Sequence, residues 1–194
     1  MSLFIFDLGK VLAHGLDTTR GLREGMAFDA REFGKDYKLY ERALMDGWMR
    51  EEDYYRHVEL RFGKHVAASL SSPLPPLSAD KRLLETARAL QEKGHVCVIG
   101  SNTIASHWAC TPQEILSAFS RAYPSYQIHR SKPEPCFFSY ICSEEGFPCH
   151  DTYFIDDREE NTASAESLGI STLLFRGEGL EERAERFFAP FLRA

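Results

Sequence analysis

The stretch Leu3-Phe4-Ile5-Phe6-Asp7-Leu8-Gly9 places four apolar residues directly before a carboxylate, with a glycine two residues later. An apolar run of this length is typical of a strand buried on both faces, so we expect a parallel strand over residues 3–6. In open α/β sheets, reactive groups collect beyond the carboxyl ends of the strands. Asp7 therefore lies where a reactive group is expected, although an aspartate at a strand end is also a common helix cap or turn former.

The composition bounds the classes of protein to consider. The chain has 194 residues, of which 43% are hydrophobic and 27% charged, as is ordinary for a soluble globular protein of one domain or one domain with an insertion. A net charge of −6 argues mildly against a nucleic-acid partner. No run approaches the roughly 18 apolar residues of a membrane span, and the apolar amino terminus lacks a basic flank and is interrupted by Asp7. We therefore expect a cytoplasmic protein without nucleic-acid or membrane partners, and its oligomeric state is open.

The cysteines form no Cys-x-x-Cys pair and are odd in number: Cys97, Cys110, Cys136, Cys142 and Cys149. This usage is typical of reduced, mostly buried thiols rather than of a disulfide framework. A catalytic cysteine would need a histidine partner in space, which the spacing does not indicate.

Apolar runs and helical patterns alternate along the second part of the chain. Ser78 and Gly94 bound a predicted helix over residues 79–93. Further strands are expected near residues 96–100, 126–129, 152–155 and 171–175, and further helices near 111–121, 134–145, 159–168 and 180–188. This alternation predicts an α/β fold with a Rossmann-like, doubly wound parallel sheet.

Residues 14–75 interrupt the alternation soon after the first strand. Apolar and aromatic residues recur there at roughly helical spacing, Asp46-Gly47 and Gly63 mark helix ends, and no convincing strand is present. The proline-rich segment Ser71–Ser78 should act as a stiff hinge. We therefore expect a helical insertion over residues 14–75, within a core made of residues 1–13 and 76–194.

Polar residues also stand at the ends of the later strands. Ser101-Asn102 follow the strand near 96–100, Asp156-Asp157 follow the strand near 152–155, and Lys132 lies just before a predicted helix. Each has an ordinary alternative, because such residues often cap helices and most lysines are exposed. On one sheet edge they would together supply what phosphoryl transfer needs: a carboxylate nucleophile, acids that hold Mg²⁺, and donors for the phosphate oxygens.

The order FDLGKVL, IGSNT, SKPEP and FIDDREEN resembles the four motifs of the haloacid dehalogenase (HAD) superfamily. The resemblance covers most of the chain, because residues 14–75 stand where that superfamily inserts its C1 cap. Within the superfamily, the chain is most similar to the small phosphatases with an FDLG, SNT, KP and DD pattern, including glucose-1-phosphate phosphatases.

The resemblance implies a Mg²⁺-dependent phosphatase of small phosphorylated metabolites that works through an aspartyl-phosphate intermediate. It implies that Asp7 is the nucleophile, that Lys132 steadies both nucleophile and phosphate, and that Ser101 and Asn102 bind the phosphate. The metal ligands implied are Asp7, the carbonyl of Gly9, Asp156 and Asp157, with Asn161 in support.

Gly9 departs from the pattern of the superfamily's phosphatases, which usually carry a second aspartate at this position as general acid and base. A glycine keeps the carbonyl that the metal uses, but it transfers no proton. General acid–base help is typically worth about 10²–10⁴-fold in rate. Candidate substitutes early in the chain are His14, Asp17, His57 and His65.

Two other functions stay open. A 2-haloacid dehalogenase would also use Asp7 as nucleophile, but it needs no metal, and dehalogenases carry a bulky aromatic residue where Gly9 stands. A catalytically weak binding or regulatory protein is suggested by Gly9 itself. Substrate choice would depend on side chains of the insertion, although aromatic residues at helical spacing usually pack inward. These candidates are Arg42, Trp48, Arg50, Tyr54 and Tyr55.

Overall fold

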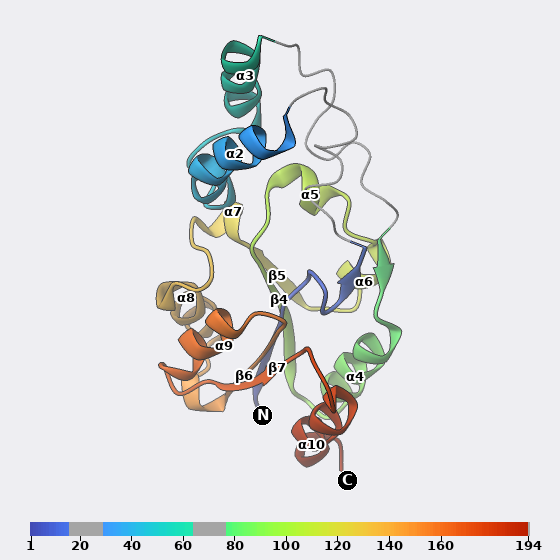
Figure 1. Cartoon of the computed structure of the whole chain (residues 1–194). Helices are drawn as coiled ribbons and strands as arrows, with labels where there is room; N and C mark the ends of the chain where they lie inside the picture. Colours follow the sequence, from blue (N-terminus) through green and yellow to red (C-terminus); the bar gives the residue numbers. More distant parts are fainter. Residues whose placement is uncertain (16–28, 64–76, 194) are drawn as a thin grey trace.

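The computed structural model describes residues 1–15, 29–63 and 77–193 (Figure 1). Its main sheet has the strand order β5-β4-β1-β6-β7, and all neighbouring strands are parallel. The strands are β1 (Leu3–Phe6), β4 (Val96–Ser101), β5 (Arg121–Pro124), β6 (Thr152–Asp156) and β7 (Ser171–Leu174). The predicted doubly wound α/β fold is therefore confirmed, with β1 at the centre of the sheet.

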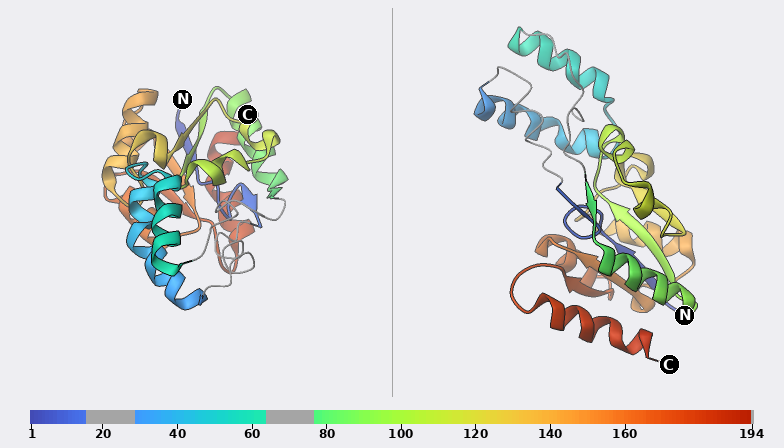
Figure 2. Two further views of the ribbon diagram at one scale, coloured as in Figure 1. Left: turned by 90° about the horizontal axis from the view of Figure 1, so that it is seen from above. Right: turned by 90° about the vertical axis from the view of Figure 1, so that its right-hand side faces the viewer.

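Helices cover both faces of this sheet (Figures 1 and 2). Phe4 and Phe6 of β1 pack on the side of α4 and α10, whereas Leu3 and Ile5 pack on the side of α8 and α9. The alternation follows from the two-residue period of a strand buried on both faces. The helices are α4 (Lys81–Glu92), α8 (Pro135–Glu145), α9 (Glu159–Glu166) and α10 (Leu180–Leu192).

A pair of helices, α2 (Ala30–Met45) and α3 (Glu51–Phe62), projects beyond the core (Figure 2). The helix ends predicted at Asp46-Gly47 and Gly63 are confirmed, because Asp46 caps α2 and Gly63 ends α3 with a φ of 63°. Most of the proline-rich segment Ser71–Ser78 lies outside the described residues. The division into core and cap domain accordingly stays a proposal.

The near end of the helix pair is attached to the core through α7 (Ser125–Ile128). The Ser125 hydroxyl donates to the Met45 carbonyl at 2.6 Å, and Nδ1 of His129 donates to the Asp46 carbonyl at 2.8 Å. Gly47 follows with a φ of 68°, and a Cβ at this position would lie 2.3 Å from the Tyr126 carbonyl oxygen. The connection between α2 and α3 therefore needs glycine both for its backbone conformation and for its close approach to α7.

We expect Gly47→Ala to destabilise the chain more than Gly63→Ala, measured as the free energy of unfolding in urea. Both residues have a left-handed φ, which costs about 1–2 kcal/mol with a side chain, but a Cβ at Gly63 meets nothing within 4 Å. Only Gly47→Ala must also push α7 away from the helix pair. If both variants lose the same free energy of unfolding, the close approach of Gly47 to α7 does not add to the destabilisation.

Three sequence predictions differ from the structure around α4 and β5. The helix expected to begin after Ser78 begins after Asp80, whose side chain accepts the Leu83 N–H, because β3 (Ser78–Ala79) pairs with β2 (Ala13–His14). The strand expected near 126–129 is the helix α7, and β5 lies before it. The helix expected near 111–121 is shortened to α6 (Gln113–Leu116), and a further short helix, α5 (Ala105–Ala109), precedes it.

The cysteines differ from expectation in part. Cys97 and Cys142 are buried, but Cys110 and Cys136 are exposed, so the prediction of mostly buried thiols is wrong for those two. Among the helices of residues 1–15, 29–63 and 77–193, none combines the length and the apolar character that crossing a bilayer requires.

Candidate active site

Asp7 follows the central strand directly. Its backbone N–H donates to the Ile155 carbonyl at 2.9 Å, which continues the pairing of β1 with β6 by one residue. The residue is 8% exposed, at the carboxyl edge of the sheet. Parallel pairing therefore fixes this carboxylate beside the ends of β4 and β6, as the sequence predicts.

Lys132 reaches the same edge from the loop before α8. Its Nζ donates to Asp7 at 2.5 Å, to Asp156 at 2.7 Å and to the Gly100 carbonyl at 3.0 Å. The side chain is buried, and its three donors are matched by three acceptors. One ammonium group thus joins two carboxylates from neighbouring strands.

Asn102 holds the backbone of Lys132 in place. Its Oδ1 accepts the Lys132 N–H at 2.8 Å, and its Nδ2 donates to the Lys132 carbonyl at 2.7 Å. Both polar ends of the Asn102 side chain are engaged in this way. Asn102 therefore positions Lys132 in this structure, whereas the hydroxyl of Ser101 at the end of β4 lies buried beside the site.

Asp156 lies behind Lys132 and is fully buried. One carboxylate oxygen accepts the Arg158 N–H at 2.8 Å, the other accepts Lys132, and Nδ2 of Asn161 lies 3.0 Å from both. Asn161 therefore supports Asp156 directly. Asp157 is less buried, and its carboxylate lies 3.7 Å from Nζ of Lys10.

Three carboxylates are close enough to share one cation. Oxygen atoms of Asp7, Asp156 and Asp157 all lie within 4.8 Å of one another. Carboxylate oxygens are the ligands that Mg²⁺ prefers, and the ion usually keeps several waters as well. The donor set therefore fits a hard divalent cation, and Gly9 lines the same pocket with its backbone.

The charges of the site depend on each other. Burial raises the pKa of Asp7 to about 7; Lys132 opposes this rise, and Asp156 and Asp157 add to it. Burial also acts to lower the pKa of Lys132, but Asp156 and Asp7 raise that pKa above its usual value. Lys132 therefore stays protonated, and a cation near Asp7 favours the ionised carboxylate.

A pocket of about 190 Å³ opens onto these groups. It brings together most of the residues that the sequence selects, and Met45 at the end of α2 contributes to it from the helix pair. The lining residues are Asp7, Leu8, Gly9, Lys10, Met45, Ser101, Asn102, Thr103, His107, Lys132, Asp157, Arg158 and Asn161. Of the predicted site residues, only Asp156 lies behind the pocket wall.

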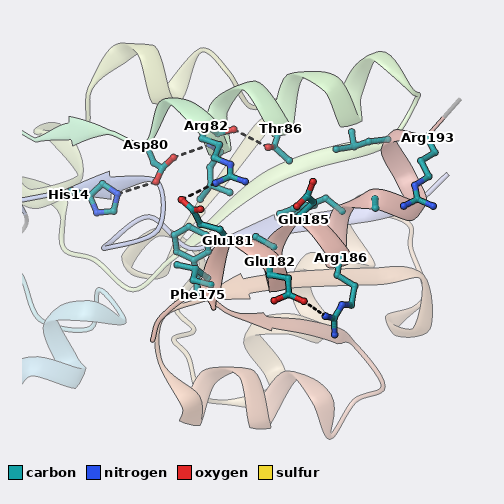
Figure 3. A pocket seen from close by; sticks show the side chains of 16 residues that line it. His14, Asp80, Arg82, Thr86, Phe175, Glu181, Glu182, Glu185, Arg186 and Arg193 are labelled. Atoms are coloured by element: carbon teal, nitrogen blue, oxygen red, sulfur yellow. Dashed lines mark hydrogen bonds and ion pairs between the residues drawn. The ribbon is translucent and has the colours of Figure 1, made fainter. Parts of the chain in front are cut away.

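The histidines considered as substitutes for the missing acid lie elsewhere. His14 bonds to Asp80 at 3.2 Å and lines a larger hollow of about 820 Å³ between α4 and α10 (Figure 3). His57 bonds to the buried Asp36 at 3.1 Å, inside the helix pair. Asp17 and His65 lie outside the described residues.

The candidate specificity residues of the helix pair also lie away from the pocket lining. Tyr54 is buried between α2 and α3, and Tyr55 bonds to Glu51 on its own helix. Arg42 pairs with Asp46 and Glu134, and Arg50 pairs with Asp53. Trp48 is 75% exposed and lies beside the ring of His129.

Sequence reasoning missed Met45 and His107. Met45 stands just before the predicted helix end at Asp46-Gly47, and its helical spacing equally suits an interior position. His107 follows the SNT motif by four residues, which is the one signal that could have indicated it. Its place in the pocket depends on the short helix α5, whose position the sequence pattern does not give.

The chain is similar to known proteins in sequence and in structure. No protein-family model matches the chain. Drimenol cyclase drtB of Aspergillus calidoustus is 27% identical over 141 residues, which is 66% of this chain and 26% of that protein. D-ribitol-5-phosphate phosphatase of Bacteroides thetaiotaomicron is 27% identical over 100 residues, 48% of each chain. The matched part thus spans about a quarter and about half of the length of these curated relatives.

Solved structures match over nearly the whole chain. A predicted HAD-like family hydrolase from Porphyromonas gingivalis has a TM-score of 0.79 and 25% identity, and the match covers 96% of this chain and 97% of that one. A HAD family enzyme from Bacteroides thetaiotaomicron, in complex with magnesium and inorganic phosphate, has a TM-score of 0.72 and 25% identity over 89% of this chain and 93% of its own. With its sheet order and the four motifs at one sheet edge, the chain has the fold of the haloacid dehalogenase (HAD) superfamily and is similar to hydrolases of that superfamily over nearly its whole length.

Proposed function

We propose that the chain is a Mg²⁺-dependent phosphatase of small phosphorylated metabolites. The observation that carries this proposal is the buried Lys132 ammonium, which holds Asp7 at 2.5 Å and Asp156 at 2.7 Å, with the carboxylate of Asp157 close by. An oriented, ionised carboxylate is suited to attack phosphorus, and neighbouring acids are suited to hold the cation that phosphate oxygens need.

In the proposed reaction, Asp7 attacks the phosphorus atom in line with the bond to the leaving oxygen and becomes aspartyl-phosphate. Lys132 orients Asp7 and offers positive charge to the transferred group, and the Ser101 hydroxyl donates to a non-bridging oxygen. A magnesium ion held by Asp7, the Gly9 carbonyl, Asp156 and Asp157 would neutralise charge on the phosphoryl oxygens. Water then attacks the phosphorus, which releases inorganic phosphate and regenerates Asp7.

The size of the pocket supports a compact substrate. Its volume of about 190 Å³ is below the roughly 300–1,000 Å³ of sites for drug-sized ligands. The ribitol phosphate phosphatase among the relatives and the magnesium and phosphate in the similar structure agree with this substrate class and cofactor. We therefore infer a leaving group of a few carbon atoms, such as a sugar or polyol.

The test is phosphate release from a panel of sugar phosphates, polyol phosphates, nucleoside monophosphates and p-nitrophenyl phosphate. We expect release in Mg²⁺, loss of release in EDTA, and recovery when Mg²⁺ is returned. Compact phosphates should be turned over with higher kcat/KM than nucleotides, because the pocket is small. Turnover that is unaffected by EDTA would contradict the metal dependence.

Chloride release and phosphate release separate the other two functions from this one. A 2-haloacid dehalogenase would release chloride from 2-chloropropionate without Mg²⁺, and the three clustered carboxylates argue against it because that reaction needs no metal. A binding or regulatory protein would release no phosphate from any substrate. Either result would overturn the proposal.

A further inference from the structure

The proposed phosphatase reaction needs a group that moves protons, and Gly9 has no side chain to do so. A departing alkoxide must gain a proton when Asp7 displaces it, and the water that later attacks the aspartyl-phosphate must lose one. Any replacement must therefore line the pocket that contains Asp7.

His107 meets this requirement. It lies on α5, which begins three residues after Asn102, and the residue is 8% exposed at the wall of the pocket that also contains Asp7. The Ser106 N–H donates to the carboxylate of Glu51 at 2.9 Å, so α3 of the helix pair holds α5 against the site. This bond places α5, and His107 with it, where the core and the helix pair meet.

The other titratable groups of the pocket have different tasks. Asp7 is the nucleophile, Asp157 belongs to the cation cluster, and all three donors of Lys132 are engaged. Lys10 is 72% exposed in its side chain and faces Asp157, and the guanidinium of Arg158 pairs with Glu160 and does not release a proton near neutrality. An imidazole ordinarily titrates near neutral pH and can both give and take a proton there.

We propose that His107 is the general acid and base of this site. This inference rests on the proposed phosphatase function. In the first step, Asp7 forms a bond to phosphorus, the bond from phosphorus to the leaving oxygen breaks, and the imidazolium gives its proton to that oxygen, which leaves as an alcohol. In the second step, the neutral imidazole takes a proton from water as the water oxygen bonds to phosphorus. The bond to Asp7 then breaks, and inorganic phosphate leaves.

The test compares His107→Gln with His95→Gln on two substrates. His95 precedes β4 at the opposite end of the sheet, where it accepts the Ser2 N–H, so it controls for the loss of a partly buried histidine. The substrates are p-nitrophenyl phosphate, whose leaving group needs no proton, and the best alkyl phosphate of the panel. For the alkyl phosphate, we expect His107→Gln to lower kcat/KM by about 10²–10⁴-fold.

For p-nitrophenyl phosphate, kcat/KM should stay near the wild-type value, because it reports the first step alone. The kcat should fall, and a burst of p-nitrophenol should appear, because the second step still lacks its base. Gly9→Asp in the His107→Gln background should restore alkyl phosphate turnover. Among the described residues, the glycines with positive φ do not include Gly9, so its φ does not itself require a glycine.

A measurement on the wild type covers the case in which His107→Gln does not fold. The wild-type kcat/KM for the alkyl phosphate should fall as the pH rises above neutral. The kcat/KM for p-nitrophenyl phosphate should not show this fall. The proposal is overturned if the two substrates share one pH profile, or if His107→Gln lowers both kcat/KM values equally or neither. If the wild type releases phosphate from no substrate, the phosphatase function and the role of His107 are both overturned. If the wild type is active but gives one of the overturning results just named, only the role of His107 is overturned.

Discussion

Asp7→Asn will abolish phosphate release and will also raise the thermal stability of the metal-free chain at neutral pH. The first effect follows because an amide does not form the aspartyl-phosphate. The second follows from burial, which raises the pKa of Asp7 from 3.8 to about 7. The neutral amide removes a desolvated charge, and Lys132 keeps Asp156 and the Gly100 carbonyl as acceptors.

The stability gain depends on pH in a defined direction. The folded chain holds the Asp7 proton more tightly than the unfolded chain does, so the contribution of Asp7 to stability is complete below pH 3.8 and is lost as the pH rises through about 7. The melting temperature of Asp7→Asn in EDTA should therefore exceed that of the wild type by a margin that widens from pH 4 to pH 8.

The control is Asp151→Asn, because Asp151 is exposed on the turn before β6. This variant should keep both its activity and the wild-type pH dependence. Phosphate release by Asp7→Asn would remove Asp7 from the role of nucleophile. If the difference in melting temperature between Asp7→Asn and the wild type does not change with pH, burial of the Asp7 charge does not lower the stability of the wild type.

Lys132→Met will abolish activity and lower the melting temperature strongly. The substitution leaves two buried carboxylates, Asp7 and Asp156, without their shared cation. Breaking a buried ion pair by removing one partner costs about 3–5 kcal/mol, or about 6–20 °C for a chain of this size. Methionine has a similar length, so the loss reports charge rather than volume.

Circular dichroism melts and the phosphate assay check this expectation. Lys93→Met is the matched control, because Lys93 is exposed at the end of α4. It should melt within about 1–2 °C of the wild type, since surface changes are usually within ±0.5 kcal/mol. A stable and active Lys132→Met would show that Lys132 is dispensable for both charge balance and reaction.

The residues at the sheet edge could be predicted from the sequence because short stretches of the chain identify the strands that carry them. Apolar runs identify the long central strands, and parallel topology then requires that Asp7, Ser101 and Asp156 meet at one edge. Lys132 is different: a lysine before a proline gives no local sign of burial, and only its place in the motif order indicates the site.

The parts that could not be predicted depend on tertiary contacts. β5 has four residues at the sheet edge and ends at Pro124, too short a run to show a period of two. The following Ser125 is fully buried and bonds to Met45, so the apolar residues after it form a helix against α2 rather than a strand. His107 and Met45 reach the pocket through the same packing of short helices and the helix pair.

The attachment of α2 to α7 bears on how new substrate preferences can arise. Ser125 and His129 donate to the carbonyls of Met45 and Asp46, and every amino acid brings such a carbonyl. The side chain of residue 45, which faces the pocket, can therefore be exchanged while its main chain stays bound. A substitution at residue 45 should therefore change the pocket lining without detaching α2 from α7, so that Asp7 and Lys132 keep their positions relative to the helix pair.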